Sequence, residues 1–302
     1  MRMVVILVLR LVMFWNVENM FDTRPDNGGE DFSYKGEHVW TSKRFGRKCD
    51  AIAKTILASS DRYGQMPDII GLAELENAYV LKRIAGAAAL KKYGYGCVHF
   101  ESADPRGIDV GLLNRKKTMK LTAAMAYRVV SEKGDTIATR DILCACFDDS
   151  LAVLVNHHPS KYGGAKESSP KRASAIRTMM EIIDSLRLAG YSKIISMGDF
   201  NAPGDDENFN GVTLRNESLK LMREGRGTIK YDGKWELIDM FFTEGLQGDM
   251  TIFDFPPLLC RDSTHSGEKP FRTWSGPRYN GGVSDHLPIF FKIITIFEDS
   301  DE

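Results

Sequence analysis

Short apolar runs recur along the whole chain, and most are bounded by Gly, Pro, Asp or Asn. Most are rich in β-branched or aromatic residues, which is typical of β-strands. Such runs lie at about 10–17, 68–73, 95–100, 108–114, 127–130, 141–147, 151–156, 193–198, 236–242, 250–254 and 288–296. This number of strands constrains the fold strongly, because each strand needs a neighbour in a sheet and a covered apolar face.

Three longer segments, at 42–59, 78–92 and 171–188, carry apolar residues at helical spacing. The dipeptide Asp232-Gly233 is typical of a two-residue hairpin turn. Many strands with few helices favour a β-rich α/β protein in which two sheets face each other and the helices lie outside.

The chain of 302 residues shows no Pro/Gly/Ser-rich linker and no repeat. Its length is compatible with two domains, but large α/β folds often run this long as one domain. We therefore expect a single domain over residues 1–302, with its core at about 10–294. The polar loops are longer than connections require, and loops of this kind usually build a binding rim. They lie at 23–41, 159–171, 202–217 and 255–284.

A formal net charge of −1 lacks the basic character of a protein that coats nucleic acid, although it permits a local basic patch. The five cysteines include no CxxC pair and predict neither a disulfide framework nor a zinc site. The apolar run 4–9 is too short to span a bilayer, and no signal-peptide cleavage site follows it. We expect a cytoplasmic protein without stable membrane insertion or an obligate protein partner, and export stays open.

Five apolar runs end in Asn, Asp, Glu or His, whose side chains can bind a metal ion or transfer a proton. Asp199 and Asn201 follow one run two residues apart, so an extended strand would present both on one side. A turn in which these side chains bind their own backbone explains the pair equally well. The other four ends read "NVEN", "GLAELEN", "NHHPS" and "SDHLP". Five such ends suggest a shared rim.

Carboxylate and amide oxygens at these ends suit Mg²⁺ or Mn²⁺. Imidazoles beside them can donate to a phosphoryl oxygen or transfer a proton. A metal ion, two histidines and an acid that orients water are the parts needed to hydrolyse a phosphate ester.

Together with "GDFN", these strings occur in an order that resembles the endonuclease/exonuclease/phosphatase superfamily, of the deoxyribonuclease I-like and exonuclease III-like kind. The longer strings "FWNVENMFD", "RGIDVGLLN" and "KWELIDMFF" resemble a Bacteroides-type branch of it. The resemblance covers about residues 10–294. It implies a four-layer α/β/β/α sandwich of two packed mixed β-sheets with outer helices, and a site at the top of the two sheets.

The resemblance also implies a metal site for Mg²⁺ or Mn²⁺. Glu74 matches the metal-binding glutamate, with Glu76 as the alternative on the same strand face. Asn16 matches an asparagine that contacts metal or phosphate, and Asp285 lies on the metal side of the neighbouring histidine. Glu18 occupies a position where relatives often carry an acid near the metal.

Five further residues match catalytic positions. Asp199 resembles the aspartate that orients or deprotonates the attacking water, and Asn201 the amide that holds a phosphoryl oxygen. His286 resembles the histidine that faces the scissile phosphate, and Asp239 the acid that orients this histidine. His157 is the candidate for protonating the leaving oxygen.

Two pairs of neighbours need a structural explanation. Asp285 and His286 would point in opposite directions on a strand, so both reach one site only if residues 284–286 form a turn. His158 stands where an aromatic residue is expected, and we assign it to stacking or to the rim.

Three basic residues are candidates for binding substrate phosphate: Arg106, Arg140 and Lys161. An arginine at a sheet rim can hold a phosphate with two hydrogen bonds. A structural Arg–Asp pair, for example with Asp109, is the alternative for both arginines. Lys161 lies in a locally basic loop at 160–172, which is either solvated or a substrate contact.

The resemblance implies a Mg²⁺- or Mn²⁺-dependent phosphoesterase in which water attacks in line, without a covalent intermediate. The primary prediction is a nuclease acting on DNA. The alternative is a phosphodiesterase or phosphatase for a small-molecule, inositol or lipid phosphate ester, because the sequence shows no aromatic and basic face. An inactive scaffold is disfavoured because each expected catalytic side chain is present.

Overall fold

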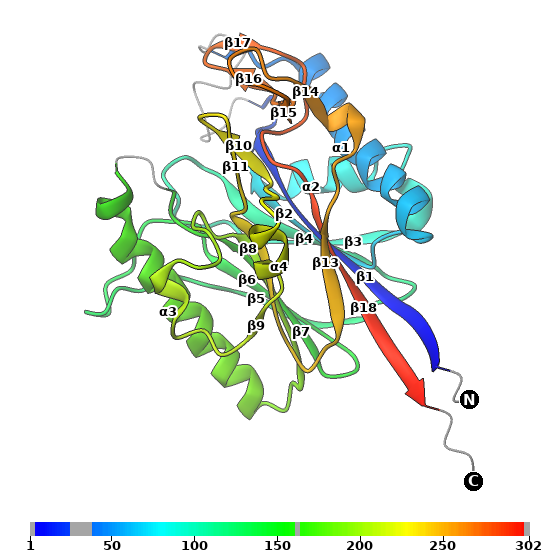
Figure 1. The fold of residues 1–302 in the computed structure, drawn as a ribbon, viewed down its shortest axis with the longest axis vertical. Helices are drawn as coiled ribbons and strands as arrows, with labels where there is room; N and C mark the ends of the chain where they lie inside the picture. The colour runs from blue at the N-terminus through cyan, green and yellow to red at the C-terminus, as the bar shows by residue number, and fades with distance from the viewer. Residues whose placement is uncertain (1–3, 25–37, 161–163, 299–302) are drawn as a thin grey trace.

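The computed structural model describes residues 4–24, 38–160 and 164–298, and two six-stranded sheets form its centre (Figure 1). The first sheet has the order β13-β18-β1-β2-β4-β3 and the second the order β5-β6-β7-β8-β12-β9. Strands of the first sheet are β1 (Val4–Met20), β2 (Ile69–Leu75), β3 (Tyr95–His99), β4 (Asp109–Arg115), β13 (Gly248–Ile252) and β18 (Ile289–Glu298). Strands of the second are β5 (Leu121–Tyr127), β6 (Ile142–Phe147), β7 (Leu151–His157), β8 (Lys193–Asp199), β9 (Arg215–Asn216) and β12 (Asp239–Glu244).

Helices cover the outer face of each sheet, which confirms the four-layer sandwich (Figure 1). Helices α1 (Ser42–Tyr63) and α2 (Ala78–Ala85) lie on the first sheet, and α3 (Ala165–Leu188) lies on the second. The short helix α4 (Leu219–Arg223) and three 3₁₀ turns, at Lys91–Tyr93, Glu207–Phe209 and Pro256–Leu258, complete the helical segments described. None of the described helices is both long and apolar enough to cross a membrane.

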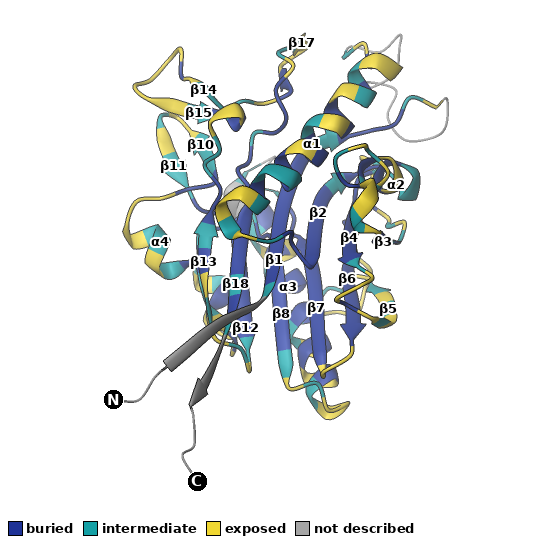
Figure 2. Cartoon of the chain, turned by 90° about the vertical axis from the view of Figure 1, so that its right-hand side faces the viewer, coloured by how far each residue is buried: buried dark blue, intermediate teal, exposed yellow. Residues whose placement is uncertain are grey.

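The central strands are buried on both faces (Figure 2). On β6, Leu143 and Ala145 face the other sheet, whereas Cys144 and Cys146 face α3. This alternation follows from the two-residue period of a strand. It confirms that both cysteines are core residues, and neither forms a disulfide.

Three pairs of short strands stand above the sheets at one end of the molecule (Figure 1). They are β10 (Ile229–Tyr231) with β11 (Lys234–Glu236), β14 (Leu259–Arg261) with β15 (Glu268–Pro270), and β16 (Trp274–Ser275) with β17 (Arg278–Tyr279). The turn between β10 and β11 has positive φ at Asp232 (45°) and Gly233 (76°), as a type I′ hairpin requires, which confirms that prediction.

Two predicted elements were wrong in position. No strand covers 127–130; β5 lies at Leu121–Tyr127, and Val130 forms only an isolated bridge with Thr136. The strand β5 is at a sheet edge and exposes Thr122 and Ala123, so its apolar signal is weak. The helix expected over 78–92 ends at Ala85, because the chain turns at Gly86.

The topology brings several chain segments to one end of the sandwich. Each sheet contains one parallel pair, β1 with β2 and β7 with β8, whose carboxyl ends lie at the same edge. The strands β12 and β18 run antiparallel to their neighbours and therefore begin at that edge. This arrangement collects four strand ends and two strand starts in one place.

Candidate active site

Three site residues lie side by side across the second sheet. In the registers of β7, β8 and β12, Asp199 is the direct partner of both His157 and Asp239. Asn16, at the facing edge of the first sheet, donates from Nδ2 to Asp199 Oδ2 at 3.0 Å and to Glu74 Oε1 at 3.2 Å. One asparagine therefore joins the acids of the two sheets.

His286 reaches this group from a turn, as the sequence required. Residues 284–286 precede β18 and are not part of a strand. Ser284 Oγ donates to Asn16 O at 2.6 Å, and Trp15 Nε1 donates to His286 O at 2.9 Å. These bonds fix the turn to β1.

The imidazole of His286 lies between two carboxylates. Its Nδ1 is 2.8 Å from Asp239 Oδ2, and its Nε2 is 3.8 Å from Asp199 Oδ2. Burial alone would lower the pKa of His286, but Asp239, Asp199 and Asp285 together raise this pKa well above its usual value. At neutral pH the side chain is an imidazolium that can bind an anionic oxygen.

Asp199 is buried, with 2% of its surface exposed. Burial, followed by the charge of Asp239, raises the pKa of Asp199 to about 7, and His286 opposes this shift. A carboxylate with a pKa near neutrality is well matched to accepting a proton from water.

His157 is neutral in this site. Its Nε2 lies 3.6 Å from Asp199 Oδ2 and 3.9 Å from Glu74 Oε1. Burial, and then the charges of Arg140 and Arg106, lower the pKa of His157 well below its usual value. The side chain is therefore suited to donating a hydrogen bond, whereas the resemblance implied a proton donor to the leaving oxygen.

Of the two geometries that the sequence allowed, the structure has the local turn and not the extended strand, because β8 ends at Asp199. Its backbone has φ of 52°, and its N–H donates to Asp199 Oδ1 at 2.9 Å, which is the local turn. Its Nδ2 donates to the carbonyl of His158 at 3.0 Å. The ring of His158 is buried edge-on against Phe200, in agreement with a stacking residue.

The acids at the ends of β1 and β2 lie on a bent backbone. Glu18, Asn19 and Glu74 all have positive φ, at 52°, 45° and 65°. Because of this bend, the Glu74 carboxylate lies next to Asn16, and it also accepts a hydrogen bond from the backbone N–H of Asn19 at 2.6 Å. Glu76 instead accepts from the backbone N–H of Asp22, so the structure brings Glu74 rather than Glu76 to the site.

Glu18 and Asp285 form the outer part of the acidic group. Glu18 accepts from the backbone N–H groups of Thr273 and Trp274, at 2.6 and 3.2 Å. Asp285 pairs with Arg272 at 2.9 Å. Burial, and then the charge of Asp285, raise the pKa of Glu18 to about 7.

Lys48 is a further residue of this region that no sequence motif indicated; it is a buried lysine of α1 whose Nζ donates to the carbonyl of Glu18. Burial lowers the pKa of Lys48 to about 8, and the acids Glu18, Glu74 and Asp285 oppose this shift. A signal for it existed, because Lys48 interrupts the apolar face that carries Phe45 and Ile52.

The three candidate phosphate contacts differ. Arg140 is 5% exposed and binds Asp104 at 2.8 Å and the carbonyls of His157 and His158, which fits the structural alternative. Arg106 has a side chain that is 46% exposed and lies 3.4 Å from Asp104, so its guanidinium can meet solvent or substrate. Lys161 lies outside the described residues.

Two facing mixed sheets, with acids and imidazoles where their strand ends meet, define the class of phosphoester hydrolases built on a four-layer sandwich. Residues 11–295 match the model of the Endonuclease/Exonuclease/phosphatase family, and the chain belongs to this family. Its members hydrolyse phosphate esters. A comparison with curated protein sequences finds no match.

Solved structures with the same fold span nearly the whole chain. D. rerio TDP2 complexed with a single-strand DNA product is 18% identical, with a TM-score of 0.56, over 95% of this chain and 98% of that one. The human Nocturnin catalytic domain with bound sulfate is 16% identical, with a TM-score of 0.56, over 98% of each chain. A family protein from Bacteroides thetaiotaomicron is 15% identical, with a TM-score of 0.59, over 100% of each chain.

Proposed function

We propose that this protein is a divalent-metal-dependent phosphodiesterase that cleaves DNA by direct attack of water. The observation that carries the proposal is the arrangement around Asp199. An acid with a pKa of about 7 lies beside the His286–Asp239 pair and opposite Glu74, at the meeting point of both sheets.

The residues present fit a divalent cation. Glu74 and Asp285 would hold it, with Asn16 beside them, and such oxygen donors are the ones that Mg²⁺ and Mn²⁺ prefer. Burial, and then the charge of Asp285, raise the pKa of Glu18, and a cation held beside these acids would oppose both effects. When bound, the cation polarises the phosphoryl group and neutralises developing charge.

The chain's own residues perform the remaining roles. Ionised Asp199 holds the attacking water and accepts its proton. The imidazolium of His286, kept charged by Asp239, donates Nε2–H to a phosphoryl oxygen, where charge grows in the transition state. Neutral His157 adds a hydrogen bond next to Asp199.

Two pairs of basic and aromatic side chains, in the segments that follow β1 and begin α1 and in the facing parts of α2 and β17, support DNA as the substrate. Arg44 lies over the ring of Tyr279, with its guanidinium carbon 4.2 Å from the ring centre. Arg24 lies over Tyr79 at 3.7 Å. Such groups bind phosphates and stack on bases. The structural relative TDP2, bound to a single-strand DNA product, agrees with this substrate class.

The test is cleavage of supercoiled plasmid and of a single-stranded oligonucleotide with Mg²⁺, Mn²⁺ or EDTA. We expect cleavage that EDTA abolishes and that the Asp199→Asn and His286→Gln variants lack. If the wild type hydrolyses bis-p-nitrophenyl phosphate but does not cleave DNA, the protein is a phosphodiesterase whose substrate is a small phosphate ester. A lack of metal-dependent activity on both substrates would refute the proposal.

A further inference from the structure

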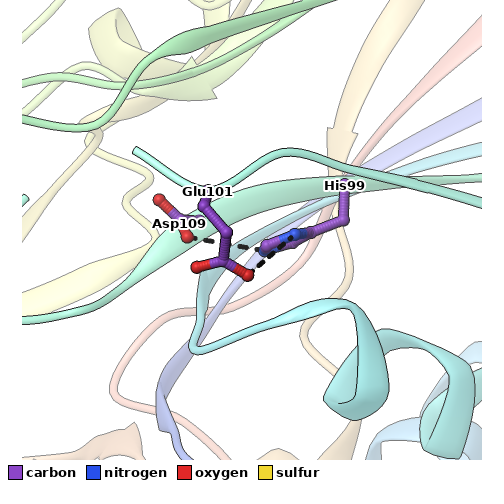
Figure 3. A group of neighbouring side chains, drawn as sticks. All are labelled: His99, Glu101 and Asp109. Atoms are coloured by element: carbon purple, nitrogen blue, oxygen red, sulfur yellow. Dashed lines mark ion pairs between the residues drawn. The ribbon is translucent and has the colours of Figure 1, made fainter. Parts of the chain in front are cut away.

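A second group of potential ligands lies at the ends of β3 and β4, outside the proposed active site. It consists of His99, Glu101 and Asp109, whose side chains converge (Figure 3). The Nε2 atom of His99 is 3.5 Å from Asp109 Oδ2, and its Nδ1 atom is 3.8 Å from Glu101 Oε1. One ligand atom from each residue lies within 4.8 Å of the other two.

The His99 imidazole is buried without a hydrogen bond at one nitrogen. Its side chain is 3% exposed, and Nε2 has no hydrogen-bond partner among the described residues. This atom faces Asp109, whose side chain is 5% exposed and whose other oxygen accepts from the backbone N–H of Ser102 at 3.1 Å. A buried polar atom without a partner is costly, so a bound group between the two side chains would relieve that cost.

We propose that His99 Nε2 and Asp109 Oδ2 form a binding site for a divalent transition-metal ion, Zn²⁺ or Mn²⁺, and that Glu101, which lies on the Nδ1 side of the ring, adds negative charge at the solvent-exposed edge of the site. Metal–ligand distances of about 2.1 Å at tetrahedral angles place the donor atoms about 3.4 Å apart, close to the separation of His99 Nε2 and Asp109 Oδ2. The imidazole selects these ions over Mg²⁺ and Ca²⁺, which favour oxygen-only sites. Burial lowers the pKa of His99 to about 4, so the ring is in its metal-binding neutral form at neutral pH.

The position of the site suggests what the ion does. His99 and Asp109 flank the loop 100–108, and this loop carries Asp104. Asp104 binds Arg140, which in turn holds the backbone carbonyls of His157 and His158. An ion that closes the base of the loop would stabilise the position of Arg140.

Glu101 has a side chain that is 72% exposed, so the site opens to solvent and an ion can enter. It also provides a variant that is safe for folding, because its substitution leaves no buried gap. The proposal stands on different residues from the proposed function, and its test does not depend on catalysis.

The test uses the full-length protein after removal of metals by EDTA and dialysis. Zn²⁺ binding is measured by calorimetry, and Co²⁺ is added as a probe with visible absorption. We expect the wild type to bind Zn²⁺ at this site and the His99→Gln variant to lose that binding at least tenfold. Glu74→Gln should keep it, because the two sites share no ligand.

His265→Gln is the matched control. This imidazole also lies near two carboxylates, at 3.5 Å from Asp232 and 3.7 Å from Asp262, but Asp262 already pairs with Lys230 and Lys269. We expect no change in Zn²⁺ binding. Unchanged binding in His99→Gln would refute the site. If His99→Gln fails to fold by circular dichroism, Glu101→Gln decides, with weakened Zn²⁺ binding expected and unchanged binding refuting the site.

Discussion

Asp239 sets the charge of His286 through a hydrogen bond of 2.8 Å. Both side chains are buried, so little water screens the interaction. The pair allows the ring to remain protonated at a pH where free histidine is neutral. Because the pKa of Asp199 is raised to about 7, this carboxyl group is ionised only at a pH near or above 7. An ionised Asp199 and a protonated His286 therefore occur together on the alkaline side of neutrality.

We predict that Asp239→Asn lowers kcat by about 100- to 1,000-fold, because the ring loses the charge that stabilises the transition state. The fall of activity on the alkaline side should also move to lower pH. A pH profile with bis-p-nitrophenyl phosphate measures both effects. Asp249→Asn, at an exposed position on β13, is the control. An unchanged profile in Asp239→Asn would show that Asp239 does not act through His286.

Asp199 couples pH to stability. Its folded-state pKa of about 7 exceeds the ordinary value of 3.8, so the folded protein binds more protons than the unfolded chain between these values. Its contribution to the free energy of unfolding therefore falls as pH rises from about 4 to 7.

The variant Asp199→Asn has no carboxyl group at this position, so this fall in the free energy of unfolding is absent from it. In EDTA at pH 8 we expect a melting temperature about 3–5 °C above that of the wild type, and little difference at pH 4. Thermal unfolding followed by circular dichroism at both pH values measures this. A variant less stable than the wild type at pH 8 would contradict a raised pKa for Asp199.

At the scale of elements, the parallel pairing of β7 and β8 sets the site's geometry. Gly198 precedes Asp199, and a Cβ atom there would collide with the backbone oxygen of Asn156, its partner in register. Only glycine allows the two strands to lie this close at the point where His157 and Asp199 emerge. The ends of these two strands carry the candidate catalytic residues, and the glycine sets the spacing between the strands.

Gly198→Ala should separate the strands locally. We expect a loss of about 1–3 kcal/mol in the free energy of unfolding and a fall in kcat, because the catalytic pair is displaced. Urea unfolding and steady-state kinetics measure the two effects. Gly211→Ala is the matched control, since a Cβ atom there meets nothing within 4 Å. Wild-type stability and activity in Gly198→Ala would show that the contact is readily relieved.

At the scale of the whole molecule, the site lies where two sheets meet beneath a rim of small strand pairs (Figure 1). The rim segment at Thr273 and Trp274 binds Glu18 through two backbone N–H groups. These two hydrogen bonds connect the rim to the acids at the end of β1.

We predict that binding of single-stranded DNA to the inactive Asp199→Asn variant weakens about 10- to 100-fold between 50 and 200 mM salt. Adding Arg44→Ala should weaken binding further and reduce the salt dependence. Arg62→Ala is the matched control, because Arg62 also lies over a ring, that of Phe253, but near the opposite end of α1. Fluorescence anisotropy measures the affinities. Salt-independent binding would favour a small phosphate ester.

Much of the architecture was predictable from local pattern. Nearly all predicted strands and the three helices exist, because alternation of apolar residues and turn residues such as Asp232-Gly233 act over a few positions. The edge strand β5 was misplaced because an exposed strand carries little apolar signal. The candidate site residues could be named from the sequence because polar side chains end buried runs and match known strings, and the structure brings several of them together.

Local spacing in the sequence specifies most of the elements, the family and the residue types at the strand ends. Which of those residues meet, and in what charge state, follows from the folded chain. It separated Glu74 from Glu76 through a backbone bend, made Arg140 a support for two backbone carbonyls, and buried Lys48 beside the acids. The physical reason is that a pKa and a contact depend on burial and on neighbours distant in the chain, which no local pattern encodes.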